Sequence, residues 1–170
     1  MKFLKYLSFI LIYFIFNISV AQAIDKIAFI DIDLILKNSN LGKSLLIEFE
    51  KINTQNSQML KKNEKELKEL EEEIKKKQNI ISRDELNKEL NILKDKIKVF
   101  NETKSNLMIN FEKKRNKEIN QFLIKINPII QNYMDQNSID ILLERKNVFI
   151  GKNDSDITEN ILKNINDNLK

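Results

Sequence analysis

The chain has 170 residues, with 29 Lys and Arg against 25 Asp and Glu, and it contains neither cysteine nor histidine. The lack of cysteine excludes disulfides and thiol chemistry, and the lack of histidine removes the commonest general base and the usual zinc ligands. We therefore expect a binding or structural protein, with no enzyme activity, no cofactor and no metal.

The N-terminal segment has the pattern of a secretory signal peptide. Lys2 and Lys5 form a short basic start, residues 9–20 are largely apolar, and Ala21 to Ala23 is a small-residue cleavage signal. An uncleaved membrane anchor is the alternative, but the apolar stretch is shorter than the span of about 20 residues that an anchor needs. We predict that residues 1–23 are removed and that the mature chain is exported.

Two short stretches near the start of the mature chain and three near its end are typical of strands and helices. Residues 26–32 are a β-branched apolar run, residues 138–143 alternate before becoming apolar, and residues 148–150 are a third strand candidate. A short helix is expected over residues 33–37. The last helix is expected to run from Asp156, as its N-cap, to about residue 169.

The long segment between them, residues 41–137, is predicted to form one helical hairpin. Apolar side chains recur at steps of three and four residues in both halves, which is the pattern of a coiled-coil seam. A turn is expected near residues 78–81, because Ser82 and Glu85 have the spacing of a capping box that begins a second helix. Pro128 removes one helical hydrogen bond and predicts a kink near the end of the second helix.

Folding about this turn pairs Phe49 with Phe111 and Asn56 with Lys104 in a single register. Polar residues on a seam cost stability, and they either fix the register or loosen the pair. A loosened middle section would let the helices bend, whereas long side chains that reach solvent would leave the packing unchanged. The polar seam positions are Asn56, Asn63, Lys104 and Arg115.

The segments outside the hairpin, residues 24–40 and 138–170, form a body of about 50 residues, below the size of about 60 at which single domains become marginal. Its strands also leave unpaired edges, which can pair with another chain. Both features predict self-association through the strands. The residues expected in this oligomerisation body are Ile27, Phe29, Ile30, Ile139, Ile141, Leu142, Val148, Phe149 and Ile150.

The order of these segments resembles the Skp/OmpH family of periplasmic chaperones, most specifically at Lys26 to Asp31, Ile139 to Leu143 and Asp156 to Leu162. The resemblance implies a jellyfish-like homotrimer, mainly α-helical, with a small β body and three projecting arms, in the periplasm of a Gram-negative-type envelope. It also implies an ATP-independent holdase that keeps unfolded outer-membrane β-barrel proteins in the cavity between the arms and delivers them for membrane assembly. A non-catalytic envelope scaffold is the alternative.

Apolar residues outside the seam are candidates for weak, diffuse contact with such clients. Met59 and Met108 are expected instead to complete the packing between the two helices. The client-binding candidates are Leu46, Ile47, Ile92, Val99, Ile109 and Ile124.

The expected tip of the hairpin combines basic and apolar side chains, a pattern that suits lipopolysaccharide or an anionic membrane surface. A solvated hairpin end is the alternative. No specific nucleic-acid binding is expected, since stacking aromatics are not interleaved with the basic residues. The tip candidates are Lys75, Lys76, Lys77, Ile80, Ile81, Arg83 and Lys88.

Overall fold

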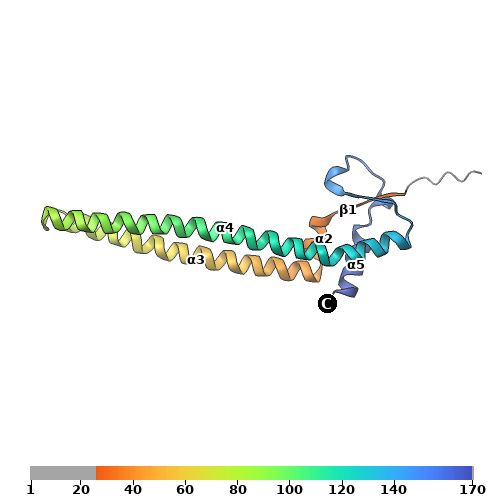
Figure 1. Cartoon of the computed structure of the whole chain (residues 1–170), viewed down its shortest axis with the longest axis horizontal. Helices are drawn as coiled ribbons and strands as arrows, with labels where there is room; N and C mark the ends of the chain where they lie inside the picture. The colour runs from red at the N-terminus through yellow and green to blue at the C-terminus, as the bar shows by residue number, and fades with distance from the viewer. Residues whose placement is uncertain (1–25, 170) are drawn as a thin grey trace, which may run out of the picture.

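The computed structural model describes residues 26–169 of the chain. Two long helices lie side by side and project from a group of short elements (Figure 1). The elements in chain order are β1 (Ile27–Ile30), α2 (Ile32–Asn38), α3 (Asn40–Lys77), α4 (Arg83–Gln136), β2 (Ile141–Glu144), the 3₁₀-helices η1 (Arg145–Asn147) and η2 (Asn153–Ser155), and α5 (Thr158–Asn168). The predicted mainly helical chain with a small strand body is confirmed, and its assembly into a trimer stays a prediction.

The predicted signal peptide over residues 1–23 lies outside the described residues. Within residues 26–169, no helix combines the length and the apolar character that crossing a membrane requires.

The arm consists of α3 and the part of α4 that faces it, residues 40–118 in all. Each of its helices begins at a serine N-cap: the Ser39 hydroxyl accepts a hydrogen bond from the Gly42 amide at 3.1 Å, and the Ser82 hydroxyl accepts one from the Glu85 amide at 3.3 Å. These hydrogen bonds satisfy amides that the first helical turn leaves without a partner. The predicted start of the second helix at Arg83 is confirmed.

The predicted register of the arm is confirmed by contacts between α3 and α4. The rings of Phe49 and Phe111 lie 6.3 Å apart, centroid to centroid, in an edge-to-face arrangement. Lys114 forms an ion pair with Glu48 across the two helices. Because α4 has 54 residues against 38 in α3, its last part extends beyond the arm and packs against the short elements.

The body consists of residues 119–136 of α4 together with β1, α2, β2, η1, η2 and α5. β1 and β2 pair in parallel, with Ile27 opposite Ile141 and Phe29 opposite Leu143. Side chains alternate across a sheet, so Ala28, Ile30, Leu142 and Glu144 lie on one face, which turns its apolar side chains toward the helices. The other face carries Ile27, Phe29, Ile141 and Leu143. The side chains with 0% exposure at the centre of this core are Ile35, Ile126, Ile161 and Ile165.

The arm joins the body at Ser39, which ends α2 and caps α3. Its side chain is fully buried. Gly42 packs so closely here that an added Cβ would lie 1.9 Å from the carbonyl oxygen of Leu36. The close approach of α2 and α3 therefore requires glycine at this position.

Both strands are shorter than predicted. β1 ends at Ile30 because Asp31 turns the chain and caps α2, its carboxylate accepting a hydrogen bond from the Leu34 amide at 2.9 Å. β2 begins only at Ile141 because Ser138 has a φ of 52° and lies in a turn after α4. A left-handed residue of this kind is incompatible with an extended strand.

The predicted third strand over residues 148–150 is wrong for this chain. These residues form a bend between the two 3₁₀-helices and have no strand partner among the described residues. Phe149 and Ile150 are 103% and 86% exposed. A β-branched, aromatic run needs a neighbouring edge to become a strand, and this segment does not reach one.

The predicted N-cap at Asp156 is also wrong. Asp156 makes a parallel bridge with Phe29, and the amide of Ile157 donates to the Phe29 carbonyl oxygen at 3.0 Å. This pairing holds Asp156 extended, so α5 begins at Thr158. The Asp156 carboxylate still accepts a hydrogen bond from the Thr158 amide at 3.0 Å.

Candidate functional surfaces

The client-binding candidates are all exposed in the structure, from 36% at Leu46 to 68% at Ile47 and Ile124. They are distributed over the base of α3, most of α4 and the α4 segment beyond the arm, and they do not converge on one patch. This distribution suits several weak contacts along an extended molecule and does not suit a single pocket. The role of these residues in binding stays a prediction.

The expectation that two methionines complete the packing between the arm helices is wrong. Met59 and Met108 are 48% and 62% exposed. At 3.6 residues per turn, each lies about a quarter of a turn away from its neighbouring seam leucine, Leu60 or Leu107, and so faces outward. These two flexible side chains therefore add to the exposed apolar surface of the arm.

The middle of the arm contains two clefts, one on each side of Phe100. The first cleft, which we call the basic cleft, has a volume of about 320 Å³, and the second, the acidic cleft, has a volume of about 360 Å³. The basic cleft is lined by Asn56, Leu60, Lys61, Phe100, Lys104, Leu107 and Phe111, among others. The acidic cleft is lined by Asn63, Glu66, Leu67, Asp95, Lys96, Val99, Phe100 and Thr103.

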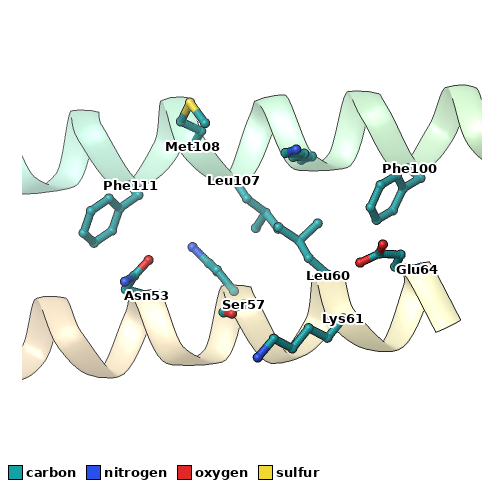
Figure 2. Close-up of a pocket in the computed structure, with 11 residues that line it drawn as sticks. Asn53, Ser57, Leu60, Lys61, Glu64, Phe100, Leu107, Met108 and Phe111 are labelled. Carbon is teal, nitrogen blue, oxygen red and sulfur yellow. The ribbon is translucent and has the colours of Figure 1, made fainter.

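Figure 2 shows the basic cleft between the two helices, with Leu60 and Leu107 pointing toward each other across it. Phe100 and Phe111 point from α4 toward α3 on either side of this pair (Figure 2). The sequence indicated the polar seam positions that lie here but not the clefts themselves. The signal was nevertheless present, because a short or solvent-seeking side chain on a seam leaves unfilled space.

The tip of the arm is less basic than its composition suggests. Lys75 pairs with Glu71 at 2.8 Å, and Lys77 pairs with Glu73 at 2.8 Å. The hydrogen bond that the Lys75 ammonium donates to the Glu71 carboxylate raises the pKa of Lys75 above its usual value. In the same way, the hydrogen bond that Lys77 donates to Glu73 raises the pKa of Lys77.

Among the described residues, the basic tip candidates outside any ion pair are Lys76, Arg83 and Lys88. Ile80 is 84% exposed beside them, whereas Ile81 is half-buried. The structure places all tip candidates in or next to the turn between α3 and α4, where Ile80 is the most exposed apolar side chain.

The body has an apolar sheet face that the chain itself leaves open. Ile27, Ile141 and Leu143 lie on this face and are 51%, 42% and 40% exposed. Phe29 shares the face but is buried, because Gly151 packs against its ring and the guanidinium of Arg145 lies 5.3 Å from the ring centroid.

The nine residues predicted for the oligomerisation body divide by burial. Phe29, Ile30 and Ile139 are buried within the chain's own core, while Leu142 and Val148 are half-buried. The exposed members are Ile27, Ile141, Phe149 and Ile150. Leu143 was missed by the sequence analysis, although its alternation with Ile141 could have indicated it.

Comparison with known proteins gives one family and one fold. The model of the family described as "Outer membrane protein (OmpH-like)" matches residues 26–165. A similar solved structure is that of a protein described as an outer membrane chaperone (OmpH-like) from Caulobacter crescentus CB15, with a TM-score of 0.77 and 18% identity over 89% of this chain and 90% of that one. This likeness establishes a shared fold. None of the curated proteins matches the chain.

Proposed function

Because the chain belongs to the OmpH-like outer membrane protein family, we propose that it is an ATP-independent holdase chaperone of the periplasm. Its clients are unfolded outer-membrane β-barrel proteins, which it keeps from aggregating and delivers for membrane assembly. Three copies associate through their bodies, and the arms enclose the cavity that holds a client. The protein acts by binding and release alone, without catalysis and without a cofactor.

The observation that carries this proposal is the apolar surface left open along α3 and α4. Complete burial of a Val, Leu or Ile side chain is worth about 1.5–3 kcal/mol, and the six client-binding candidates are already partly covered. Each contact therefore contributes on the order of 1 kcal/mol. Many contacts of this size hold an unfolded chain while leaving it mobile, so that it can be released without ATP.

Self-association is supported by the open apolar face of the body. Ile27, Ile141 and Leu143 form a continuous patch on the sheet, and Phe149 projects from the neighbouring loop with its whole side chain in solvent. Large exposed apolar groups in one place mark interaction surfaces more often than scattered ones do. A second and a third copy cover this face in the proposed trimer.

The tip of each arm is proposed to contact lipopolysaccharide or an anionic membrane surface weakly. Lys76, Arg83 and Lys88 supply the free charge, and Ile80 supplies an apolar group. Attraction of this kind falls off within a Debye length of about 8 Å at physiological salt. It therefore assists delivery and does not anchor the protein.

The proposal is tested by light scattering with mass determination on residues 24–170, alone and with a urea-denatured outer-membrane barrel protein diluted into the sample. We expect a mass of three chains and a soluble complex of defined stoichiometry. A monomer or dimer that leaves the barrel to aggregate would refute the holdase and favour an envelope scaffold with a fixed partner.

A triple variant separates client binding from the folding stability of the protein. Ile47→Asn, Ile92→Asn and Ile124→Asn replace exposed apolar groups, so the free energy of unfolding should change little while barrel aggregation increases severalfold. The matched control replaces exposed polar residues of the same arm and should protect the barrel as the wild type does. The control substitutions are Gln58→Ser, Asn91→Ser and Asn110→Ser.

A further inference from the structure

The basic cleft has an apolar wall that the seam of the arm does not fill. Leu60, Phe100, Leu107 and Phe111 all line it and are only half-buried. Asn56 and Lys104 occupy the seam positions between them, and neither supplies an apolar group that would close the gap. The arm therefore keeps a site of about 320 Å³ in which apolar surface is accessible from solvent.

The charges around this site are not balanced. Among the described residues, neither Lys61 nor Lys104 forms an ion pair, although both line the cleft. The carboxylate in the lining belongs to Glu64, which already pairs with Lys68 at 3.5 Å. The cleft thus offers two lysines without an acidic partner next to an apolar wall.

The acidic cleft provides an internal comparison. Its lining holds Glu66 and Asp95 together with Lys96, so that carboxylates are in excess there. At 3.6 residues per turn, Val99 and Thr103 lie on one side of the line through Phe100 and Leu107 on α4, and Met108 lies on the other. The two clefts therefore open on opposite sides of the arm and carry opposite excess charge.

We propose that the basic cleft is a binding site for one large apolar side chain of an extended acidic polypeptide segment. This inference rests on the proposed function, because it assigns the sequence feature that the arm selects in an unfolded client. A volume of about 320 Å³ lies at the lower end of the range of about 300–1,000 Å³ for ligand pockets. It admits a side chain but not a folded element.

The geometry of an extended chain fits both parts of the site. Residues i and i+2 of a strand point to the same side and lie about 7 Å apart. When an aromatic side chain enters between Leu60 and Phe100, a carboxylate two residues away is therefore within reach of Lys61 or Lys104. The attraction is between exposed charges, so it weakens as salt is added.

The test uses three fluorescently labelled peptides and the full mature protein. The probe is an 11-residue peptide with one central Phe and Asp residues two positions on either side; one matched peptide replaces both Asp by Lys, and the other replaces Phe by Ala. We expect the wild type to bind the probe at least fivefold more tightly than either matched peptide, by fluorescence anisotropy at low salt. Equal affinity for the three peptides, or no binding, would overturn the proposal.

The variant Asn56→Leu with Lys104→Leu completes the seam and fills the cleft. Its affinity for the probe should fall at least fivefold while its Tm stays equal or rises, since apolar residues replace polar ones on a coiled-coil seam. Loss of binding with gain of stability cannot come from misfolding. Asn63→Leu, at the acidic cleft, is the matched control and should bind the probe as the wild type does.

A second double variant shows whether the loss of binding in the first one comes only from repacking of the two helices. Lys61→Gln with Lys104→Gln removes both charges and keeps polar side chains that are one atom shorter, and it should abolish the preference for the Asp peptide over the Lys peptide. If either double variant binds the probe like the wild type, the cleft is not the site. Suppression of barrel-protein aggregation by the wild type is measured in parallel. Failure to suppress aggregation counts against the holdase function, whereas peptide binding alone decides whether the cleft is a binding site.

Discussion

The arm and the body bury their apolar side chains in different ways. In the body, β1, α2, α4 and α5 all contribute to one cluster whose central side chains are fully buried. In the arm, the seam of two helices leaves most apolar residues half-exposed, and only Phe49 and Ile74 are buried apolar side chains within residues 40–118. The fold is therefore held mainly at the body, and the arm can present apolar surface at little cost to its stability.

Truncating one phenylalanine in each region tests this difference most strongly. Phe122 lies in the body core and is 2% exposed. Phe122→Ala should lower the free energy of unfolding of the protein by about 3–5 kcal/mol, because it leaves a cavity. Phe111→Ala on the half-buried arm seam should cost about 1–2 kcal/mol. Urea unfolding at one fixed protein concentration measures both. Equal losses would mean that the arm and the body are one cooperative core.

The two serine N-caps offer a smaller and better matched comparison. Ser39 is fully buried at the body end of α3, and Ser82 is exposed at the tip before α4. Ser39→Ala should cost about 1–2 kcal/mol, since the Gly42 amide loses its partner away from water, whereas Ser82→Ala should cost about 0.5 kcal/mol. Thermal unfolding of the two variants shows which of them loses more stability. A larger loss in Ser82→Ala than in Ser39→Ala would contradict the comparison.

The smallest expected effect concerns the ion pair between the arm helices. The hydrogen bond that the Lys114 ammonium donates to Glu48 raises the pKa of Lys114 above its usual value of 10.5. A raised lysine pKa contributes stability that is fully present below pH 10.5 and is lost as the pH rises through the folded-state pKa. Glu48→Gln should therefore lower the Lys114 pKa, and its stability deficit relative to the wild type should shrink above pH 10.5.

A titration of Lys114 followed by NMR, with urea unfolding at pH 9 and pH 11, measures this effect. Glu112→Gln is the control, because Glu112 pairs with Arg115 within α4 and not with Lys114. A Lys114 pKa that does not move in Glu48→Gln would mean that the ion pair is not formed in solution.

The arm was predictable because its signals are local. The three- and four-residue steps, the capping residue Ser82 and the pairing of Phe49 with Phe111 all follow from spacing along the sequence, and the structure has them in place. The clefts were not predicted, since the sequence marks Asn56 and Lys104 as polar but does not give the volume that they leave open.

The body was predicted less well because its decisive contacts join distant residues. The bridge between Phe29 and Asp156 moves the start of α5, and Gly151 against the ring of Phe29 turns the chain at the predicted third strand. Neither contact leaves a pattern within ten residues of sequence. Local propensity at residues 148–150 was therefore overridden by contacts made across the fold.

The parallel pairing of β1 with β2 has a consequence for the order in which the chain folds during its synthesis. Ile27 pairs with Ile141, and the whole arm lies between them in the sequence. Because the N-terminus of the chain emerges first, both arm helices become available before β1 has a partner. The two arm helices therefore pair with each other first, through contacts between residues that are near in sequence. Closure of the sheet comes last, and a chain cut short before Ile141 would keep β1 as an open edge that invites aggregation.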